Sequence, residues 1–207
     1  INICDNKCIC LFEYSDNDSI SFNVRYDLGY NSSLIISKFY YNNKCNEIVN
    51  INLNKSGAAI KYNFSSININ DNFYKINVYH LDNKTSSDIF NRIVANKDSS
   101  NYLDINSYVN NGIKECYLNQ STKIVALDDS ENRVNPNMFI SEEDVTAIHS
   151  STIGNISEED LFYLMSRGIT YSDSVKLIVK GMILSNINPD MEHREKILGI
   201  LDEIGGE

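Results

Sequence analysis

Three histidines and five cysteines are the side chains of this chain best suited to bind a transition metal. Val145, Ala147 and His149 would share one face of a strand that runs from Asp144 to His149. A neutral imidazole beside a thiolate or carboxylate could hold iron or a nascent cluster, because iron centres accept these donors. The alternative is a histidine at a strand end that bonds a backbone carbonyl, and the residues alone favour this alternative.

The cysteines form one short cluster and two isolated positions, Cys45 and Cys116. In the cluster, Cys8 and Cys10 would project to the same side of one strand, within reach of one metal, whereas Cys4 would need a turn. Free cysteine also behaves as a small buried hydrophobic residue, and that interpretation is favoured for the cluster. An odd number of cysteines in a chain of this size favours reduced thiols in a cytosol-like compartment over disulfides.

Length and charge exclude several classes of protein. The chain has 207 residues and 42% hydrophobic residues, enough for one large or two small domains with a buried core. Lys and Arg number 18 against 28 Asp and Glu, and the net charge of -10 is unfavourable for a protein that coats nucleic acid. No apolar stretch approaches the roughly 20 residues of a membrane span, so we expect a soluble protein with no membrane partner. The chain begins at Ile1 without a signal sequence, which indicates a fragment or a processed chain.

Up to about Ile140 the chain consists of short segments in which apolar and polar residues alternate, as strands with one buried face do. Clear examples are 19–24, 48–53, 67–70 and 75–79. Repeated short strands are compatible with a sandwich, a barrel or a solenoid, and the period alone does not choose. The abundant Asn would suit amide ladders along stacked coils, although an AT-rich genome is the favoured explanation.

After Ser157 the apolar spacing becomes helical. Ser157 followed by three acidic residues is typical of a helix N-terminus, and Gly168 lies at a natural C-terminal cap. Further helices are predicted from Ser172 to before Asn188 and over 190–204. The predicted organisation is therefore a β-rich domain over residues 1–150 and a helical domain over residues 151–207.

Two segments near the C-terminus resemble the C-terminal signature of the SufB/SufD family of iron-sulfur cluster assembly scaffolds. They are 140–154, which contains DVTAIHSSTIG, and 161–169, LFYLMSRGI. Weaker similarity to the family lies upstream, at 53–58, at His80 with 85–87, at 90–94 and at 123–129.

This resemblance implies a right-handed parallel β-helix followed by a small helical domain that docks SufC, an ABC-type ATPase. It implies a non-enzymatic scaffold that holds a transient iron-sulfur cluster and pairs with itself or with a SufB or SufD homologue, in the cytoplasm or a plastid stroma. No Gly-rich phosphate loop occurs in the chain, so nucleotide is expected to bind the ATPase partner.

The resemblance also selects site residues. His149 takes the family's histidine position and Cys116 is the second candidate ligand, whereas the cysteine of the SufB branch aligns with Ser121 or Thr122. Its absence favours SufD or a minimal homologue that replaces both proteins.

In the helical domain, Phe162, Tyr163, Arg167 and Gly168 are the predicted contacts with the ATPase, since aromatic residues and Arg are enriched in interface anchors. Two alternatives stay open: a carbohydrate-active or adhesive β-solenoid, and a purely structural dimer subunit without ligands of its own.

Overall fold

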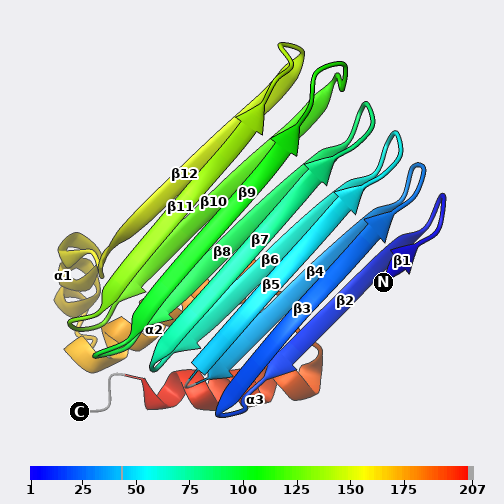
Figure 1. Cartoon of the computed structure of the whole chain (residues 1–207). Coiled ribbons are helices and arrows are strands. Elements are labelled where there is room, and N and C mark those ends of the chain that lie inside the picture. Colours follow the sequence, from blue (N-terminus) through cyan, green and yellow to red (C-terminus); the bar gives the residue numbers. More distant parts are fainter. Residues whose placement is uncertain (43, 205–207) are drawn as a thin grey trace.

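The computed structural model describes residues 1–42 and 44–204, which form twelve strands and three helices (Figure 1). The strands wind into a parallel β-helix in which each coil adds one strand to each of two facing sheets. Sheet A contains, in spatial order, β1 (Asn2–Ile3), β3 (Ser19–Leu28), β5 (Lys44–Leu53), β7 (Asp71–His80), β9 (Ser100–Val109) and β11 (Glu131–Ile140). Sheet B contains β2 (Cys8–Ser15), β4 (Ser33–Asn42), β6 (Ala59–Asn68), β8 (Ser86–Ala95), β10 (Cys116–Ala126) and β12 (Val145–Asn155).

The parallel pairing confirms the predicted β-helix and removes the sandwich and barrel alternatives. The last strand continues to Asn155, five residues beyond the boundary expected at residue 150. The core lies between the two sheets because alternate residues of every strand point inward and stack in register from coil to coil. One such column contains Val24, Val49, Ile76 and Ile105.

The core contains one group of charged side chains. Lys38 on β4 is fully buried, and its Nζ lies 2.6 Å from Oε1 of Glu47 on β5 and 3.2 Å from Oε2 of Glu13 on β2. The Tyr40 hydroxyl donates to both carboxylates. Burial alone would lower the pKa of Lys38, but the two carboxylates outweigh this effect and raise it. Lys38 is therefore a buried cation held by buried and half-buried anions.

The outer face of sheet A carries an asparagine ladder formed by Asn50, Asn77, Asn106 and Asn137. The last three of these each donate through Nδ2 to the Oδ1 of the asparagine one coil earlier, at 2.9, 3.1 and 2.9 Å. The hydrogen bonds of the ladder thus give a structural explanation for these four asparagines, for which genome composition was the favoured explanation. Beside the ladder, the rings of Tyr79, Tyr108 and Phe139 stack at 4.8 and 4.9 Å.

We expect Asn77→Ala to lower the free energy of unfolding by about 1 to 3 kcal/mol, because the buried amide joins two rungs of the ladder. The measurement is the urea midpoint. Asn23→Ala is the control, since Asn23 is exposed and its only ladder contact is 3.4 Å long. The control should change stability by less than about 0.5 kcal/mol. Equal effects would show that the ladder adds nothing.

Three helices follow: α1 (Glu158–Ser166), α2 (Tyr171–Asn186) and α3 (Met191–Glu203). The predicted Ser157 cap is confirmed, because its side chain accepts a bond from the Asp160 amide; the second helix begins one residue earlier than Ser172 and is capped by Thr170. No helix of the described residues is long and apolar enough to cross a membrane.

Helices α2 and α3 pack on the outer face of sheet B, where their apolar residues meet Phe39, Ile67 and Val94. Asn186 strengthens this contact, since its Nδ2 donates to the Phe64 carbonyl at 2.8 Å. In Figure 1 the helices lie along the side of the solenoid at which the sheet B strands finish.

Candidate functional site

The last coil of the solenoid is the place where the predicted histidine lies. Within the described residues, β12 pairs only with β10 and β11 only with β9, so both strands keep one unpaired edge. Three large apolar side chains at this end are exposed: Phe139 by 52%, Ile148 by 49% and Ile153 by 46%. Unpaired strand edges with exposed apolar residues favour pairing with another chain.

His149 lies on β12 and is exposed. It is in register with Gln120 of β10, and Leu118 and Ile124, which have the same parity on β10, belong to buried clusters. His149 therefore faces the space between the two sheets, on the face of β12 that it was predicted to share with Val145 and Ala147, and no further coil of the described residues covers it. An exposed imidazole in this position can donate a nitrogen lone pair to a metal brought by a partner.

Cys116, the second candidate ligand, lies elsewhere in the solenoid. It is buried, and its Sγ lies 3.2 Å from Oγ1 of Thr85. Cys116 is in register with Val145, four residues along the strands from the pair of Gln120 and His149, a separation of about 13 Å. The two predicted ligands are therefore not brought together on one metal in this arrangement.

Thr85 links Cys116 to a buried histidine. Nδ1 of His80 lies 2.8 Å from the Thr85 hydroxyl and Nε2 lies 3.0 Å from the hydroxyl of Ser87. Burial lowers the pKa of His80 to about 4, so the ring is neutral at physiological pH. Both ring nitrogens are engaged within the core, so the contacts of His80 are structural.

The two positions aligned with the family cysteine lie one strand away from His149. Ser121 pairs with Ser150 and Thr122 with Ser151 in the register of β10 and β12. A cysteine at either position would thus be a close neighbour of the histidine strand. This chain has Ser121 and Thr122 at these positions, which carry hydroxyl groups in place of a thiol.

Among the described residues, no group of three or more His, Cys, Asp or Glu side chains comes together at the N-terminal cysteines, and metal binding by Cys8 and Cys10 stays a prediction. Cys8 and Cys10 lie on β2, two residues apart, and are exposed together with Cys4. The favoured interpretation as buried hydrophobic residues is therefore wrong for these three. Cys45, by contrast, is buried in the main core.

The predicted docking residues form an exposed patch on and after α1, which we call the α1 patch: Phe162, Tyr163, Arg167 and Gly168. Phe162 is 75% exposed and Tyr163 58%, and the Arg167 guanidinium lies 5.4 Å from the centre of the Tyr163 ring. Gly168 has a positive φ of 86° and its amide donates to the Met165 carbonyl, which ends the helix. All four residues are thus exposed, and Tyr163 and Arg167 are in contact.

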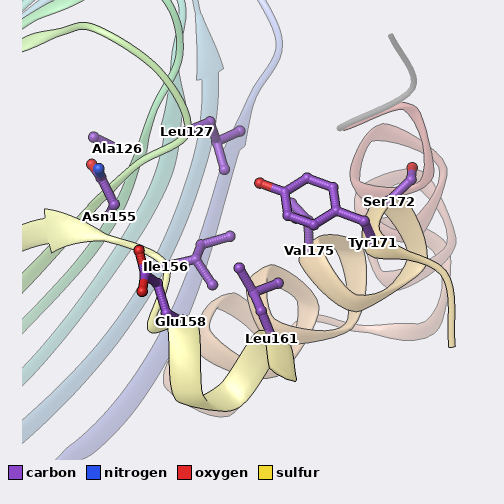
Figure 2. A pocket seen from close by; sticks show the side chains of 9 residues that line it. All are labelled: Ala126, Leu127, Asn155, Ile156, Glu158, Leu161, Tyr171, Ser172 and Val175. Carbon is purple, nitrogen blue, oxygen red and sulfur yellow. The ribbon is translucent and has the colours of Figure 1, made fainter. Parts of the chain in front are cut away.

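A cavity of about 440 Å³ lies between α1, α2 and the ends of β10 and β12 (Figure 2). Its apolar lining includes Leu127, Ile156, Leu161 and Val175, and Tyr171 borders it. Only Ile156 and Ser157 separate the end of β12 from the start of α1. The helix with the exposed aromatic residues is therefore joined directly to the strand that carries His149.

Gln120 is a feature of this region that sequence reasoning missed. It is buried, and one atom of its side chain, Oε1, has no hydrogen-bond partner. The sequence signal was available, because Gln120 lies between Leu118 and Thr122 at an inward position of an alternating strand. A polar side chain at such a position must find a partner in the core or in an adjacent site.

Comparison with known proteins identifies the family of the chain. Residues 14–182 match the family model described as SUF system FeS cluster assembly, SufBD core domain. The chain is 25% identical to the iron-sulfur cluster assembly protein SufD of Bacillus subtilis over 112 residues, which are 54% of this chain and 26% of that protein. It is 32% identical to an iron-sulfur cluster assembly SufBD family protein of Mycobacterium tuberculosis over 105 residues, 50% of this chain and 12% of the relative.

A shorter segment is more similar to an archaeal relative. Over 35 residues, 17% of this chain and 8% of the relative, it is 54% identical to a SufBD family protein of Pyrococcus horikoshii. The aligned regions thus span about a quarter or less of these three relatives. Because the family model covers most of the described strands and reaches into α2, the chain belongs to the SufBD core family of the SUF system for iron-sulfur cluster assembly.

Proposed function

We propose that this chain is a non-catalytic scaffold subunit of a SUF-type assembly complex, which holds a nascent iron-sulfur cluster at a subunit interface. The observation that carries the proposal is the position of His149, exposed on the last strand of a solenoid whose end coil is unpaired. Membership of the SufBD core family supports this function over the carbohydrate-active alternative.

A second subunit completes the site in this proposal. One imidazole supplies a single ligand, and a cluster needs several. The unpaired edges of β11 and β12 offer backbone donors and acceptors to a second copy of the chain or to a SufB or SufD homologue. Pairing there would cover Phe139 and Ile148 and place ligands of the partner beside His149.

His149→Ala should reduce the yield of cluster several-fold and change its absorption and EPR spectra after anaerobic reconstitution with iron and sulfide. Ser151→Ala is the matched control, because Ser151 has the same parity on β12 and lies two residues away. The control should give the wild-type spectra. If the alanine variant at His149 acquires the wild-type cluster, the purely structural subunit is the better description.

The α1 patch is the proposed docking site for a SufC-like ABC ATPase. Exposed aromatic residues beside an Arg have the composition of interface anchors. Because α1 follows β12 after two residues, nucleotide-driven movement of the ATPase would pull on α1 and displace the strand that carries His149. The cavity beneath Leu161 leaves room for such a shift.

Phe162→Ala combined with Tyr163→Ala should weaken binding of a SufC-like ATPase at least about 30-fold, since a single anchor residue already contributes about 2 kcal/mol or more. Isothermal titration with the purified ATPase measures this loss. Tyr30→Ala is the control, because Tyr30 is an exposed aromatic residue in the turn before β4, at the opposite end of the strands. If the wild type, the double variant and Tyr30→Ala bind the ATPase with equal affinity, the α1 patch is not its docking site.

A further inference from the structure

The amide of Gln120 is held in one orientation inside the last coils. Its Nε2 donates to the hydroxyl of Ser107 at 2.8 Å and to the carbonyl of Asn137 at 3.2 Å. Exchange of the amide oxygen and nitrogen would set the Gln120 oxygen against the Asn137 carbonyl oxygen, so the carbonyl fixes the orientation. Both Nε2 contacts reach sheet A, to β9 and β11.

The other atom of the amide, Oε1, is buried and lacks a partner. A buried acceptor without a donor is destabilising, and native proteins rarely leave one. Among the described residues, two other buried side-chain oxygens, Oγ of Ser66 and Oδ1 of Asn91, also lack a hydrogen-bond partner. Gln120 differs from them because the residue in register on the next strand is His149.

His149 offers the donor that Gln120 lacks. Adjacent parallel strands lie about 4.8 Å apart, and residues in register project to the same side. A neutral imidazole carries one N–H donor and one nitrogen lone pair. Among the strands of the described residues, β12, which carries His149, is the one that covers Gln120 on the side away from the solenoid body.

The structure contains no hydrogen bond between His149 and Gln120. We propose that a change in the side-chain rotamer of His149 brings a ring N–H to Oε1 of Gln120, which makes Gln120 the positioning residue of the histidine. The hydrogen bond fixes the tautomer and turns the other ring nitrogen, with its lone pair, toward the unpaired end of the solenoid. This inference rests on the proposed ligand role of His149 and explains how the protein prepares that ligand before iron arrives.

Ring nitrogen NMR on the full chain without metal, at pH 8, tests the proposal. The chain has three histidines, and His149→Ala assigns the signals of His149. In the wild type we expect one dominant tautomer and a ring N–H that exchanges slowly with water. Comparable populations of both tautomers in the wild type would overturn the proposal without any further variant.

Gln120→Met removes the acceptor at nearly unchanged volume, and should shift the ratio of His149 tautomers by about three- to tenfold. Thr122→Val is the matched control, since Thr122 is a buried residue of the same parity two positions along β10. The control should keep the wild-type ratio. An unchanged ratio in a folded Gln120→Met protein overturns the proposal.

The same samples separate this inference from the proposed function. A single tautomer in the wild type, together with normal cluster binding by His149→Ala, would keep the Gln120 bond and reject the ligand role. Mixed tautomers together with loss of the cluster in His149→Ala would reject the Gln120 bond and keep the ligand role.

Discussion

Lys38→Met lowers the free energy of unfolding by about 3 to 5 kcal/mol, because it leaves the buried carboxylate of Glu47 without its cation. Lys38 is fully buried and Glu47 nearly so, and their charged atoms are 2.6 Å apart. Such a loss is a large share of the about 5 to 15 kcal/mol that stabilises a typical domain. Urea unfolding followed by circular dichroism measures the change.

Two further variants test the cause. Lys61→Met is the matched control, since Lys61 is an exposed lysine on β6, and it should cost about 0.5 kcal/mol or less. In the double variant Lys38→Met with Glu47→Leu, both buried charges are absent, and we expect most of the lost stability to return. A double variant as unstable as Lys38→Met alone would argue that packing, and not charge, causes the loss.

Acidification destabilises the protein by about 3 kcal/mol through His80 alone. Burial lowers the pKa of this ring to about 4, whereas the unfolded chain has the ordinary value of 6.5. The unfolded state therefore binds more protons between these two values. The contribution of His80 is fully present above about pH 6.5 and is lost as the pH falls toward about 4.

Urea midpoints at pH 7.5, 6.5, 5.5 and 4.5 measure this dependence. His80→Gln keeps a polar side chain between Thr85 and Ser87 and should flatten the fall in stability across the window. His193→Gln is the control, because His193 is bonded to Asp190 at the surface. If His80→Gln keeps the wild-type slope, other groups cause the acid sensitivity.

The alternation of apolar and polar residues predicted the strands well, because most strands bury the residues of one face, as β7 buries Ile76 and Val78. It could not choose the solenoid, since the same period serves sandwiches and barrels; the family resemblance of DVTAIHSSTIG supplied that choice. Because Gly and Pro are few in the sequence, left-handed turns are expected to use Asn or Asp, which tolerate this backbone. Asn6 and Asn31 fit this expectation, but Lys84 and Glu115 also have positive φ.

The candidate site was predicted less completely than the fold. The sequence located His149 and its face of the strand, because strand parity is local information. The separation of Cys116 from His149 depends on the register between coils, which no single strand reveals. Lys38, Glu13 and Glu47 were missed, although each occupies an inward position of an alternating strand.

Strand β12 is stabilised by pairing along one edge, with β10. In a stack of coils, each strand is stabilised mainly by the strands beside it, so the outermost strand opens at the lowest free-energy cost. Backbone amides of β12 should thus exchange with deuterium faster than those of β8, which has a strand on both sides. Binding of a second subunit would slow that exchange, so assembly and local order at His149 are thermodynamically linked.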